Sequence, residues 1–288
     1  MSSTLYVVGT PIGNLSDMSP RAIETLNAVD LIAAEDTRVT AKLLARFNIK
    51  KPMISYHEHN EAETARKLAE RMLNEGVDVA LVSDAGMPVL SDPGATFVAL
   101  AREASVNVVC VPGPSAAITA LALSGWDEQS FTFAGFLARD EKTLAKQLSD
   151  LGKHSPIVIL YESPHRVQTL LKVVAENPNA RRVLICNDLT KLHEWVFEGN
   201  PDEAAQAFYD KPKREKGEYC VAVRFHKDEP AELAAAKVSA EALILERMLN
   251  GEDLQDASAH IISDGMARNE VYRARLRVKQ FIDGLTSE

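Results

Sequence analysis

Short apolar runs alternate with helical patterns along the first part of the chain, and this alternation restricts the fold more than any other feature. The apolar runs cover residues 5–8, 31–34, 77–82 and 106–111. Between them, apolar side chains recur every three or four residues in stretches that indicate helices, and Gly76 marks the end of one. These helices are expected at 39–47, 61–74, 93–104 and 115–123. Strands that alternate with helices predict an α/β domain with a mostly parallel sheet.

The pattern pauses in polar turn residues at 125–130 and then resumes. We expect strands of a second α/β domain at 131–136, 157–161, 183–186 and 219–225. Residues 227–236 have the composition of a linker, and three helical patterns separated by tight turns follow it. They cover 240–249, 254–262 and 269–282. We therefore predict two α/β domains, 1–124 and 125–228, and a small C-terminal helical domain at 237–288 that resembles a helix-turn-helix bundle.

The composition fits an ordinary globular protein. Of the 288 residues, 46% are hydrophobic and 25% are charged, and no apolar run approaches the ~18 residues that a membrane span needs. The N-terminus lacks the basic start of a secretory signal, so we expect a soluble cytoplasmic protein without a membrane partner. Cys110, Cys186 and Cys220 each lie in an apolar run and are predicted to be core thiols. His57 and His59 have no third ligand nearby, so we expect no metal.

The formal net charge of −9 argues against a nucleic-acid partner, but the basic residues are not evenly spread. Residues 268–282 contain five basic side chains and one acid, and residues 211–216 contain four and one. Either segment, taken alone, is a solvated face or an RNA contact. The sequence leaves both interpretations open.

Three segments rich in glycine and proline follow predicted strands of the first domain. They are residues 9–17, 83–88 and 111–116. In a parallel sheet such turns meet at the carboxyl edge of the strands, where ligands bind. Glycine permits close backbone approach, and free N–H groups can face a ligand. Neither a G-x-G-x-x-G motif nor a P-loop is present, so we expect a small ligand held largely by backbone.

Polar residues gather where other strands end. Glu35, Asp36 and Arg38 follow the second strand and suggest a charged site, although Asp36 or Thr37 could instead cap the next helix. Asp84 is either an acceptor for an ammonium or ribose group or a turn cap. In the second domain, Ser163 and Pro164 fit the cap and first turn of a helix.

At these residues the chain resembles the small-subunit ribosomal RNA ribose 2′-O-methyltransferases, a branch of the tetrapyrrole-methylase-like (class III) methyltransferases. The resemblance runs from about residue 4 to 226 and is weaker beyond. It rests on the motifs at 10–15, 33–38, 57–61, 83–86, 91–94, 112–116 and 161–166. It implies S-adenosylmethionine in a cleft between two domains, a cytidine ribose of the 16S rRNA decoding region (cytidine 1402) as acceptor, and a homodimer working on rRNA or the small ribosomal subunit.

The resemblance also assigns residues by motif position. The cofactor-binding residues it implies in the first domain are Pro11, Asp84, Gly86, Met87, Ser115 and Ala116. In the second domain it implies Tyr161, Leu189 and the neighbourhood of 217–218 over the adenine. This chain departs from the usual motifs at Met87, Asn187 and Ala138, which removes a hydroxyl and thins the basic lining.

A ribose hydroxyl is a weak acid, so its methylation benefits from a general base or a charged partner. Our candidates for the base are Glu35, Asp36 and His57, and the sequence does not rank them. Arg38 and Lys191 are candidate phosphate or ribose anchors. A structural ion pair between Glu35 and Arg38 is the alternative for that cluster.

Two rival functions remain at this point. A methylase of the same fold acting on a tetrapyrrole or another small molecule would have an enclosed apolar cleft. A non-catalytic ribosome-binding factor would keep the cofactor pocket without turnover. The charged cluster at 35–38 and the basic tail favour a polar polymer as substrate.

Overall fold

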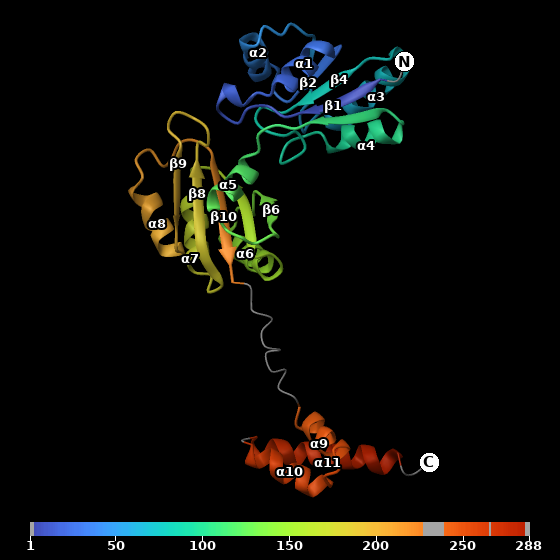
Figure 1. Ribbon diagram of the computed structural model, residues 1–288, viewed down its shortest axis with the longest axis vertical. Coiled ribbons are helices and arrows are strands. Elements are labelled where there is room, and N and C mark those ends of the chain that lie inside the picture. The colour runs from blue at the N-terminus through green and yellow to red at the C-terminus, as the bar shows by residue number, and fades with distance from the viewer. Residues whose placement is uncertain (1–2, 227–238, 265, 286–288) are drawn as a thin grey trace. The chain divides into compact units, whose positions relative to one another are not determined.

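The computed structural model describes residues 3–226, 239–264 and 266–285, with side chains to residue 282. Two compact units divide the chain near residue 226. The first contains two five-stranded sheets, and the second contains three helices (Figure 1). Each unit is described below by itself.

The first sheet is entirely parallel. Its strands are β1 (Thr4–Val8), β2 (Leu31–Ala34), β3 (Met53–Ser55), β4 (Val79–Val82) and β5 (Asn107–Val111), in the order β3-β2-β4-β1-β5. All four residues of β2 and of β4 are buried, as expected for strands covered on both faces. The parallel sheet predicted for this region is confirmed, and β3 is a strand that the sequence patterns did not indicate.

Helices cover both faces of this sheet because alternate side chains of each strand point to opposite sides. Leu31 and Ala33 pack with α3 (Glu61–Glu75) and α4 (Ala95–Glu103), whereas Ile32 and Ala34 pack with α1 (Pro20–Ala28) and α2 (Thr37–Arg46). A single 3-10 turn, η1 (Leu15–Asp17), precedes α1. The loops that follow the strands lie at the carboxyl edge of the sheet.

The second sheet is mixed. It consists of β6 (Thr132–Gly135), β7 (Ile157–Glu162), β10 (Tyr219–Phe225), β8 (Ala180–Asn187) and β9 (Trp195–Gly199), in that spatial order. Only β6 and β7 run parallel, and the other neighbours are antiparallel. The four predicted strands are present, and β9 joins them at the edge.

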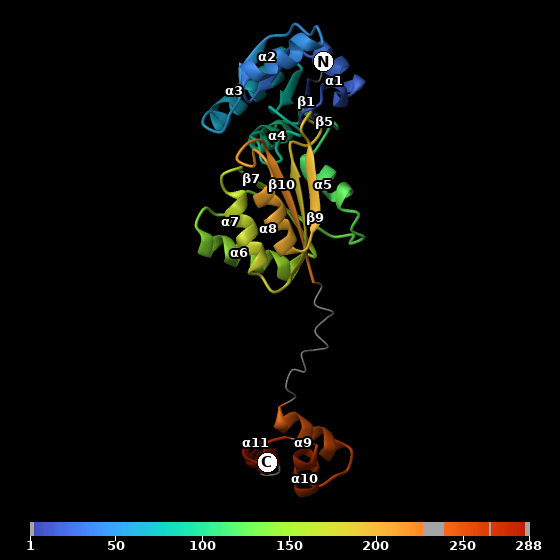
Figure 2. The same ribbon diagram turned by 90° about the vertical axis from the view of Figure 1, so that its left-hand side faces the viewer.

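The second sheet is also covered on both faces. The helices α6 (Glu141–His154), α7 (Val167–Ala175) and α8 (Pro201–Asp210) cover one face, and α5 (Ala116–Ser124) covers the other (Figure 2). Ala117 and Ala120 of α5 are fully buried against Ile157, Ile159 and Leu184. The predicted domain limits therefore stay a proposal, because α5, assigned by us to the first domain, packs on the second sheet.

The C-terminal unit is a three-helix bundle. Its helices are α9 (Ala240–Leu249), α10 (Leu254–Ser263) and α11 (Arg268–Leu285), close to the predicted ranges. Its core is small and contains Ala240, Ile244, Ala257, Ile261, Val271, Ala274 and Val278. The predicted linker at 227–236 lies outside the described residues.

Two local predictions are wrong. Cys110 is exposed, since β5 is an edge strand that is covered less completely than its neighbours, whereas Cys186 and Cys220 are buried as expected. Ser163 does not cap a helix, because α7 begins only at Val167 and residues 163–166 form a turn. Among the described residues no helix is long and apolar enough to cross a membrane.

Candidate functional site

The glycine-rich turns after β1, β4 and β5 meet at the carboxyl edge of the first sheet. The amide of Gly9 donates to the carbonyl of Val111 (3.0 Å), and Thr10 and Gly86 exchange two backbone hydrogen bonds of 2.9 and 3.1 Å. A Cβ on Gly9 would lie 2.7 Å from the backbone of Gly113, so only glycine permits this approach. We call Gly9, Thr10, Gly86 and Gly113 the glycine wall.

A cavity of about 350 Å³ lies beside the glycine wall. The residues that line it come from both sheets of the unit. They are Ile12, Ala85, Gly86, Met87, Leu90, Ser91, Asp92, Ser115, Ala116, Phe136, Tyr161, Glu162, Ser163, Pro164, Cys186, Leu189, Gly217, Glu218, Tyr219 and Cys220. This volume lies within the range of about 300–1,000 Å³ that is usual for small-molecule sites.

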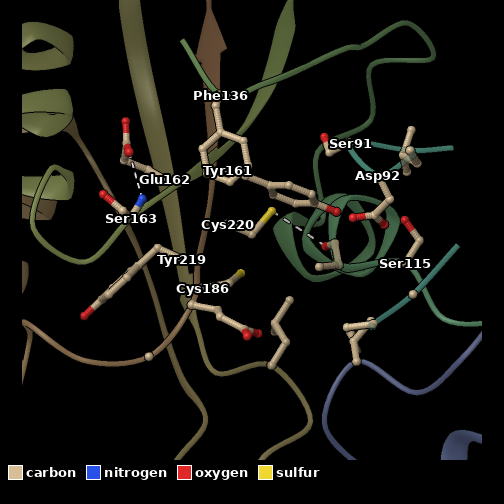
Figure 3. Close-up of a pocket in the computed structure, with 18 of the residues that line it drawn as sticks. Ser91, Asp92, Ser115, Phe136, Tyr161, Glu162, Ser163, Cys186, Tyr219 and Cys220 are labelled. Carbon is tan, nitrogen blue, oxygen red and sulfur yellow. Dashed lines mark hydrogen bonds between the residues drawn. The ribbon is translucent and has the colours of Figure 1, made fainter. Parts of the chain in front are cut away.

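Aromatic rings form the opposite side of the cavity. Tyr161 contacts Phe133 and Phe136 edge to face, with ring centroids 4.9 and 6.0 Å apart. Its hydroxyl end points towards Asp92 and Ser115 (Figure 3). Burial raises the pKa of Tyr161 to about 12, so the hydroxyl stays protonated at neutral pH. We call Phe136, Tyr161 and Tyr219 the aromatic wall.

Two thiols lie between the walls. Cys186 on β8 and Cys220 on β10 are directly paired across the sheet, and the Cys220 thiol donates to the carbonyl of Ala116 (3.7 Å). Burial raises the pKa of Cys186 to about 12 and raises that of Cys220 further above its ordinary value. Both groups are therefore neutral and act as a small apolar surface rather than as nucleophiles.

Two polar groups in the lining of the cavity are buried at a cost that hydrogen bonds within the protein do not fully offset. The hydroxyl oxygen of Ser115 is buried and has no hydrogen-bond partner of ordinary geometry in the part of the chain that the structure describes. Burial raises the pKa of Asp92 to about 6, and the charges of Glu35 and Asp84 add to this effect. A buried hydroxyl without a partner and a carboxylate held at a desolvation cost are both suited to a polar or cationic ligand.

The loop that carries Asp92 is fixed from helix α3. One carboxylate oxygen of Glu61 accepts hydrogen bonds from the amides of Gly94 (2.9 Å) and Thr96 (3.2 Å) and from the Tyr56 hydroxyl (3.2 Å). The side chain of Asn60 accepts from the His57 amide and donates to Ser55. The 57–61 motif therefore has a structural explanation, since it joins the end of β3 to the start of α4.

His57 belongs to this turn and does not line the cavity formed by the described residues. Its Nδ1 atom is buried without a hydrogen-bond partner among them, and its ring contacts that of His59 edge to face at 5.9 Å. Within the same part of the chain, no group of three or more histidine, cysteine or acidic residues has the arrangement of a metal site.

Hydrogen bonds join the acidic residues in the turns after β2 and β4. The amide of Asp36 donates to Asp84 (3.1 Å), and the amide of Asp84 donates to Glu35 (3.4 Å). Burial raises the pKa of Glu35 and that of Asp84, and their mutual repulsion raises the pKa of Glu35 further. These two carboxylates lie behind the cavity rather than in its described lining.

Asp36 has a different role from its neighbours. It caps α2 by accepting from the amide of Arg38, and its carboxylate pairs with the Arg38 guanidinium at 2.6 Å. The hydrogen bonds from Arg38 hold the pKa of Asp36 below its usual range. The ion pair with Arg38, which we had considered for Glu35 as an alternative, is made by Asp36 instead, and the capping interpretation of Asp36 is confirmed.

Lys191 lies on the loop between β8 and β9. Its ammonium pairs with Asp188 (3.0 Å) and Glu218 (2.9 Å), and these hydrogen bonds raise its pKa against the opposing effect of burial. The same loop reaches the first sheet, since the amide of Asn14 donates to the Thr190 hydroxyl (2.9 Å). Lys191 thus lies on a loop whose Leu189 lines the cavity, although Lys191 itself does not line it.

The structure brings together six of the eight residues assigned to the cofactor. They are Gly86, Met87, Ser115, Ala116, Tyr161 and Leu189. Pro11 is buried next to the lining residue Ile12, and Asp84 directly precedes the lining residue Ala85. Of the five candidate catalytic residues, none belongs to the described lining.

Several lining residues escaped the sequence analysis. Asp92 lies in the 91–94 motif that supported the family resemblance, and that motif was the available signal for it. Cys186 and Cys220 were predicted to be core thiols, and Tyr219 only to begin a strand, because nothing in an apolar strand distinguishes a residue that lines a pocket from a core residue. Phe136 lies just after β6, which ends at Gly135 rather than at 136 as predicted, and it is 60% exposed.

The three departures from the family motifs have distinct surroundings. Met87 lines the cavity, whereas Asn187 is buried and its amide donates to the carbonyls of Lys216 (3.4 Å) and Glu218 (3.2 Å). The carbonyl of Ala138 accepts from the guanidinium of Arg166 (2.7 Å). Asn187 thus serves as an anchor for a loop that contributes to the cavity.

Comparisons with known proteins agree with this geometry. Residues 4–205 match the family model of tetrapyrrole (corrin/porphyrin) methylases. The chain is 39% identical over 272 residues to ribosomal RNA small subunit methyltransferase I of Halalkalibacterium halodurans, covering 93% of each chain. This chain belongs to the ribosomal RNA small subunit methyltransferase I family. The relatives that carry this name include those of Bacillus subtilis (39% identity, 94% and 93% coverage) and Haemophilus influenzae (38%, 95% and 96%).

Solved structures of the wider fold also match. The uroporphyrin-III C-methyltransferase of Thermus thermophilus aligns with a TM-score of 0.52 at 20% identity, over 77% of this chain and 94% of that one. A diphthine synthase aligns with a TM-score of 0.58 at 16% identity, over 78% and 92%. At these identities the likeness shows that the family shares the tetrapyrrole-methylase fold.

Proposed function

We propose that this protein transfers a methyl group from S-adenosylmethionine to the 2′-oxygen of a cytidine ribose in the decoding region of 16S rRNA, cytidine 1402 by family resemblance. The observation that carries the proposal is the cavity between the glycine wall and the aromatic wall. It lies in a chain whose relatives, over nearly their whole length, are named as methyltransferases of small-subunit ribosomal RNA.

The residues around the cavity suit this cofactor. The glycine wall permits close backbone approach, and the buried Ser115 hydroxyl, which lies near the Tyr161 hydroxyl, can bond a ligand. Asp92 and Glu218 offer carboxylates to a ligand that carries a sulfonium and an ammonium group, while Tyr161 offers a flat face to an adenine ring. When bound, the cofactor supplies an electrophilic methyl group.

The protein's own contribution is placement and proton handling. In-line transfer requires the ribose oxygen to be held against the methyl carbon, and this positioning can supply about 7–11 kcal/mol of the barrier reduction. Asp92 combines a position in the lining with a pKa of about 6, so we rank it first as proton acceptor. Glu35 stays a candidate behind it, whereas the lowered pKa of Asp36 makes that residue a weak base.

The rival functions are less well supported. A tetrapyrrole substrate rests on the fold alone, since the tetrapyrrole enzymes that align are about 20% identical to this chain. A non-catalytic ribosome-binding factor would have no reason to hold Asp92 desolvated in the cavity. The names of the nearer relatives favour ribosomal RNA.

A homodimer in the cytoplasm belongs to the same proposal. Helix α5 is apolar except for Thr119 and Ser124, yet its Ile118 and Leu123 are 51% and 48% exposed in the single chain. Such a surface is typical of an interface between copies. Light scattering of the wild type and of Ile118→Glu tests this, with a dimer expected for the first and a shift towards monomer for the second.

Mapping of 16S rRNA nucleosides by mass spectrometry, in cells with and without the gene, tests the methylation directly. The expected result is one 2′-O-methylcytidine that disappears with the gene and returns with the wild-type copy. The purified protein should also methylate small subunits or free 16S rRNA from the deletion strain, and comparison of the two identifies the true substrate. Binding of S-adenosylmethionine without any turnover on either would refute the proposal.

The cofactor assignment has a separate test. Asp84→Ala should weaken S-adenosylmethionine binding in calorimetry, because Asp84 accepts from the Asp36 amide and directly precedes the lining residues Ala85 and Gly86. An unchanged affinity would remove Asp84 from the cofactor-binding residues.

A further inference from the structure

The loop between α8 and β10 concentrates positive charge in a chain whose net charge is negative. Residues 211–216, which we call the basic loop, contain Lys211, Lys213, Arg214 and Lys216 beside a single acid, Glu215. None of these four cations forms an ion pair within the described residues, whose salt bridges lie elsewhere. Their charge is therefore available to a partner.

The basic loop is held in place by its own cations and aromatic neighbours. The guanidinium of Arg214 stacks over Tyr209 at 4.5 Å, and the ammonium of Lys211 lies over Trp195 at 5.5 Å and Tyr219 at 6.0 Å. The Tyr219 hydroxyl donates to the carbonyl of Arg214 (2.9 Å). A solvated charged turn needs no such anchors, whereas a binding surface gains from being ordered in advance.

Buried polar groups fix the far end of the same loop. The amide of Asn187, a side chain that is 2% exposed, donates to the carbonyls of Lys216 and Glu218. Gly217 has a φ of 90° and lies so close to Asn187 and Asp188 that a Cβ there would clash with both side chains. These contacts hold the backbone at 216–218 in one conformation.

This backbone conformation places the basic loop beside the cavity. Gly217, Glu218, Tyr219 and Cys220 line the cavity directly after the loop ends. Since consecutive Cα atoms are about 3.8 Å apart, Lys216 stands at the margin of the cavity itself.

A second loop extends the same margin. The amide of Asp188 donates to the carbonyl of Glu218 (3.0 Å), which joins the β8–β9 loop to the end of the basic loop. In that loop Leu189 lines the cavity and Leu192 is 93% exposed. Exposed apolar and aromatic groups beside cations are what unstacked RNA bases and their phosphates require.

We propose that the basic loop binds the phosphates of the single-stranded RNA that flanks the nucleotide entering the cavity, with Leu192 and Tyr209 in contact with its bases. This inference rests on the proposed function, and it names the surface that holds the substrate. Neutral side chains at Lys213 and Lys216 would remove two phosphate contacts and leave the stacked Lys211 and Arg214 in place.

The test compares two double variants of equal charge change. Lys213→Asn with Lys216→Gln alters two exposed lysines of the basic loop, and asparagine suits the φ of 56° at position 213. The matched control, Lys142→Gln with Lys146→Gln, alters two exposed lysines of α6. Fluorescence titration with labelled oligocytidylate RNA over a range of salt concentrations gives the slope of log K against log salt.

The slope should fall by about 1.4 in the basic-loop variant, or about 0.7 for each phosphate contact on a single strand. RNA affinity at low salt should drop several-fold, while S-adenosylmethionine affinity in calorimetry stays at the wild-type value. The control pair should bind as wild type. An unchanged slope in the basic-loop variant, or an equal fall in the control, would overturn the inference.

The same preparations separate this inference from the proposed function. A wild-type protein that binds oligocytidylate through these lysines yet methylates neither small subunits nor 16S rRNA would contradict the proposed function, while the basic loop would stand as an RNA contact. Methylation that proceeds at an unchanged KM in the basic-loop variant would contradict the inference alone.

Discussion

The glycine wall and the aromatic wall enclose the same cavity by different physical means. On the glycine wall, backbone packs on backbone, with the amide of Gly9 bonded to Val111 and with Thr10 paired to Gly86. On the aromatic wall, the rings of Tyr161 and Tyr219 come from β7 and β10, which pair with each other along the sheet. The first wall therefore has no tolerance for added atoms, whereas the second can change side chains and keep its fold.

Charge follows the same division. Glu35, Asp36, Asp84 and Asp92 lie on the side of the glycine wall, and the unpaired cations of the basic loop lie beside the aromatic wall. A cationic cofactor is favoured by the first environment and a polyanionic substrate by the second. The comparison predicts that variants of one wall affect cofactor binding and variants near the other affect RNA.

The largest effect is expected at the contact of Gly9 with Gly113. In Gly113→Ala the new Cβ would lie 2.8 Å from the Gly9 backbone, so both turns must move. We expect a loss of about 1–3 kcal/mol in the free energy of unfolding, as for other overpacked sites. S-adenosylmethionine affinity in calorimetry should fall at least about tenfold, which corresponds to about 1.4 kcal/mol.

Gly125→Ala is the control for this substitution. Gly125 has a φ of 63° and no atom within 4 Å of an added Cβ, so the cost is backbone strain of about 1 kcal/mol. The cofactor affinity should be unaffected. Equal losses of cofactor affinity in the two variants would show that the glycine wall has no special rigidity.

The aromatic wall should give a smaller and more selective effect. Tyr161→Ala removes a ring that Phe133 and Phe136 support, and we expect a loss of about 1–3 kcal/mol in cofactor binding, the usual range for stacking on a base. Tyr161→Phe should keep most of the affinity. If calorimetry shows that the phenylalanine variant binds as poorly as the alanine variant, the hydroxyl rather than the ring is the binding group.

The two walls also differ in how well they could be predicted from the sequence. The glycine wall was predictable, because glycines that directly follow predicted strands indicate turns in which the backbone packs closely. The aromatic wall was only half predictable, because Tyr161 and Leu189 came from the family resemblance. Cys186 and Cys220 look like any buried strand residues until tertiary packing shows that one side of them faces a cavity.

The charged groups were harder still. Sequence placed Glu35, Asp36 and Arg38 together, but it could not show that Arg38 would pair with Asp36 and leave Glu35 desolvated. Burial raises the pKa of Asp92 first, and the charge of Glu35, which is distant in sequence and is brought near by the fold, raises it further. Long-range electrostatics of this kind has no local signature.

Asp92→Asn should raise the free energy of unfolding and lower the activity, so it tests the role of this carboxylate in the cavity. The pKa of Asp92 rises from an ordinary 3.8 to about 6 on folding, so the folded protein holds the proton more tightly and the wild type loses stability as pH rises between these values. The variant should therefore be more stable than wild type at pH 8, by about 1–2 kcal/mol after solvent screening. Below pH 4 the difference should vanish.

Urea unfolding at pH 4, 6 and 8 measures this difference, and methyl transfer by the same variant should be reduced. A stability gain accompanied by loss of activity is the usual sign of a strained functional group. A variant that is equally stable at all three pH values would mean that Asp92 is not desolvated in solution.

The smallest effect is expected in the C-terminal bundle, whose arginines are the second basic cluster. Arg277 pairs with Glu241 at 3.0 Å and Arg275 stacks on Tyr272 at 5.6 Å, so these two are already engaged within the bundle. Arg273 is exposed, and no ion pair of the described residues involves it. Of these three arginines, Arg273 alone has neither an ion pair nor a ring contact among the described residues.

Replacing Arg273, Arg275 and Arg277 together by glutamine should therefore lower the salt slope of oligocytidylate binding by about 0.7, the value for one single-strand phosphate contact. Arg273→Gln alone should reproduce that change, because Arg273 is the one of the three arginines that has no ion pair or ring contact among the described residues. If the triple variant lowers the slope by about 2, the arginines leave their partners on binding RNA, and the bundle is an RNA contact comparable to the basic loop. A slope equal to that of wild type would assign the bundle a purely structural role.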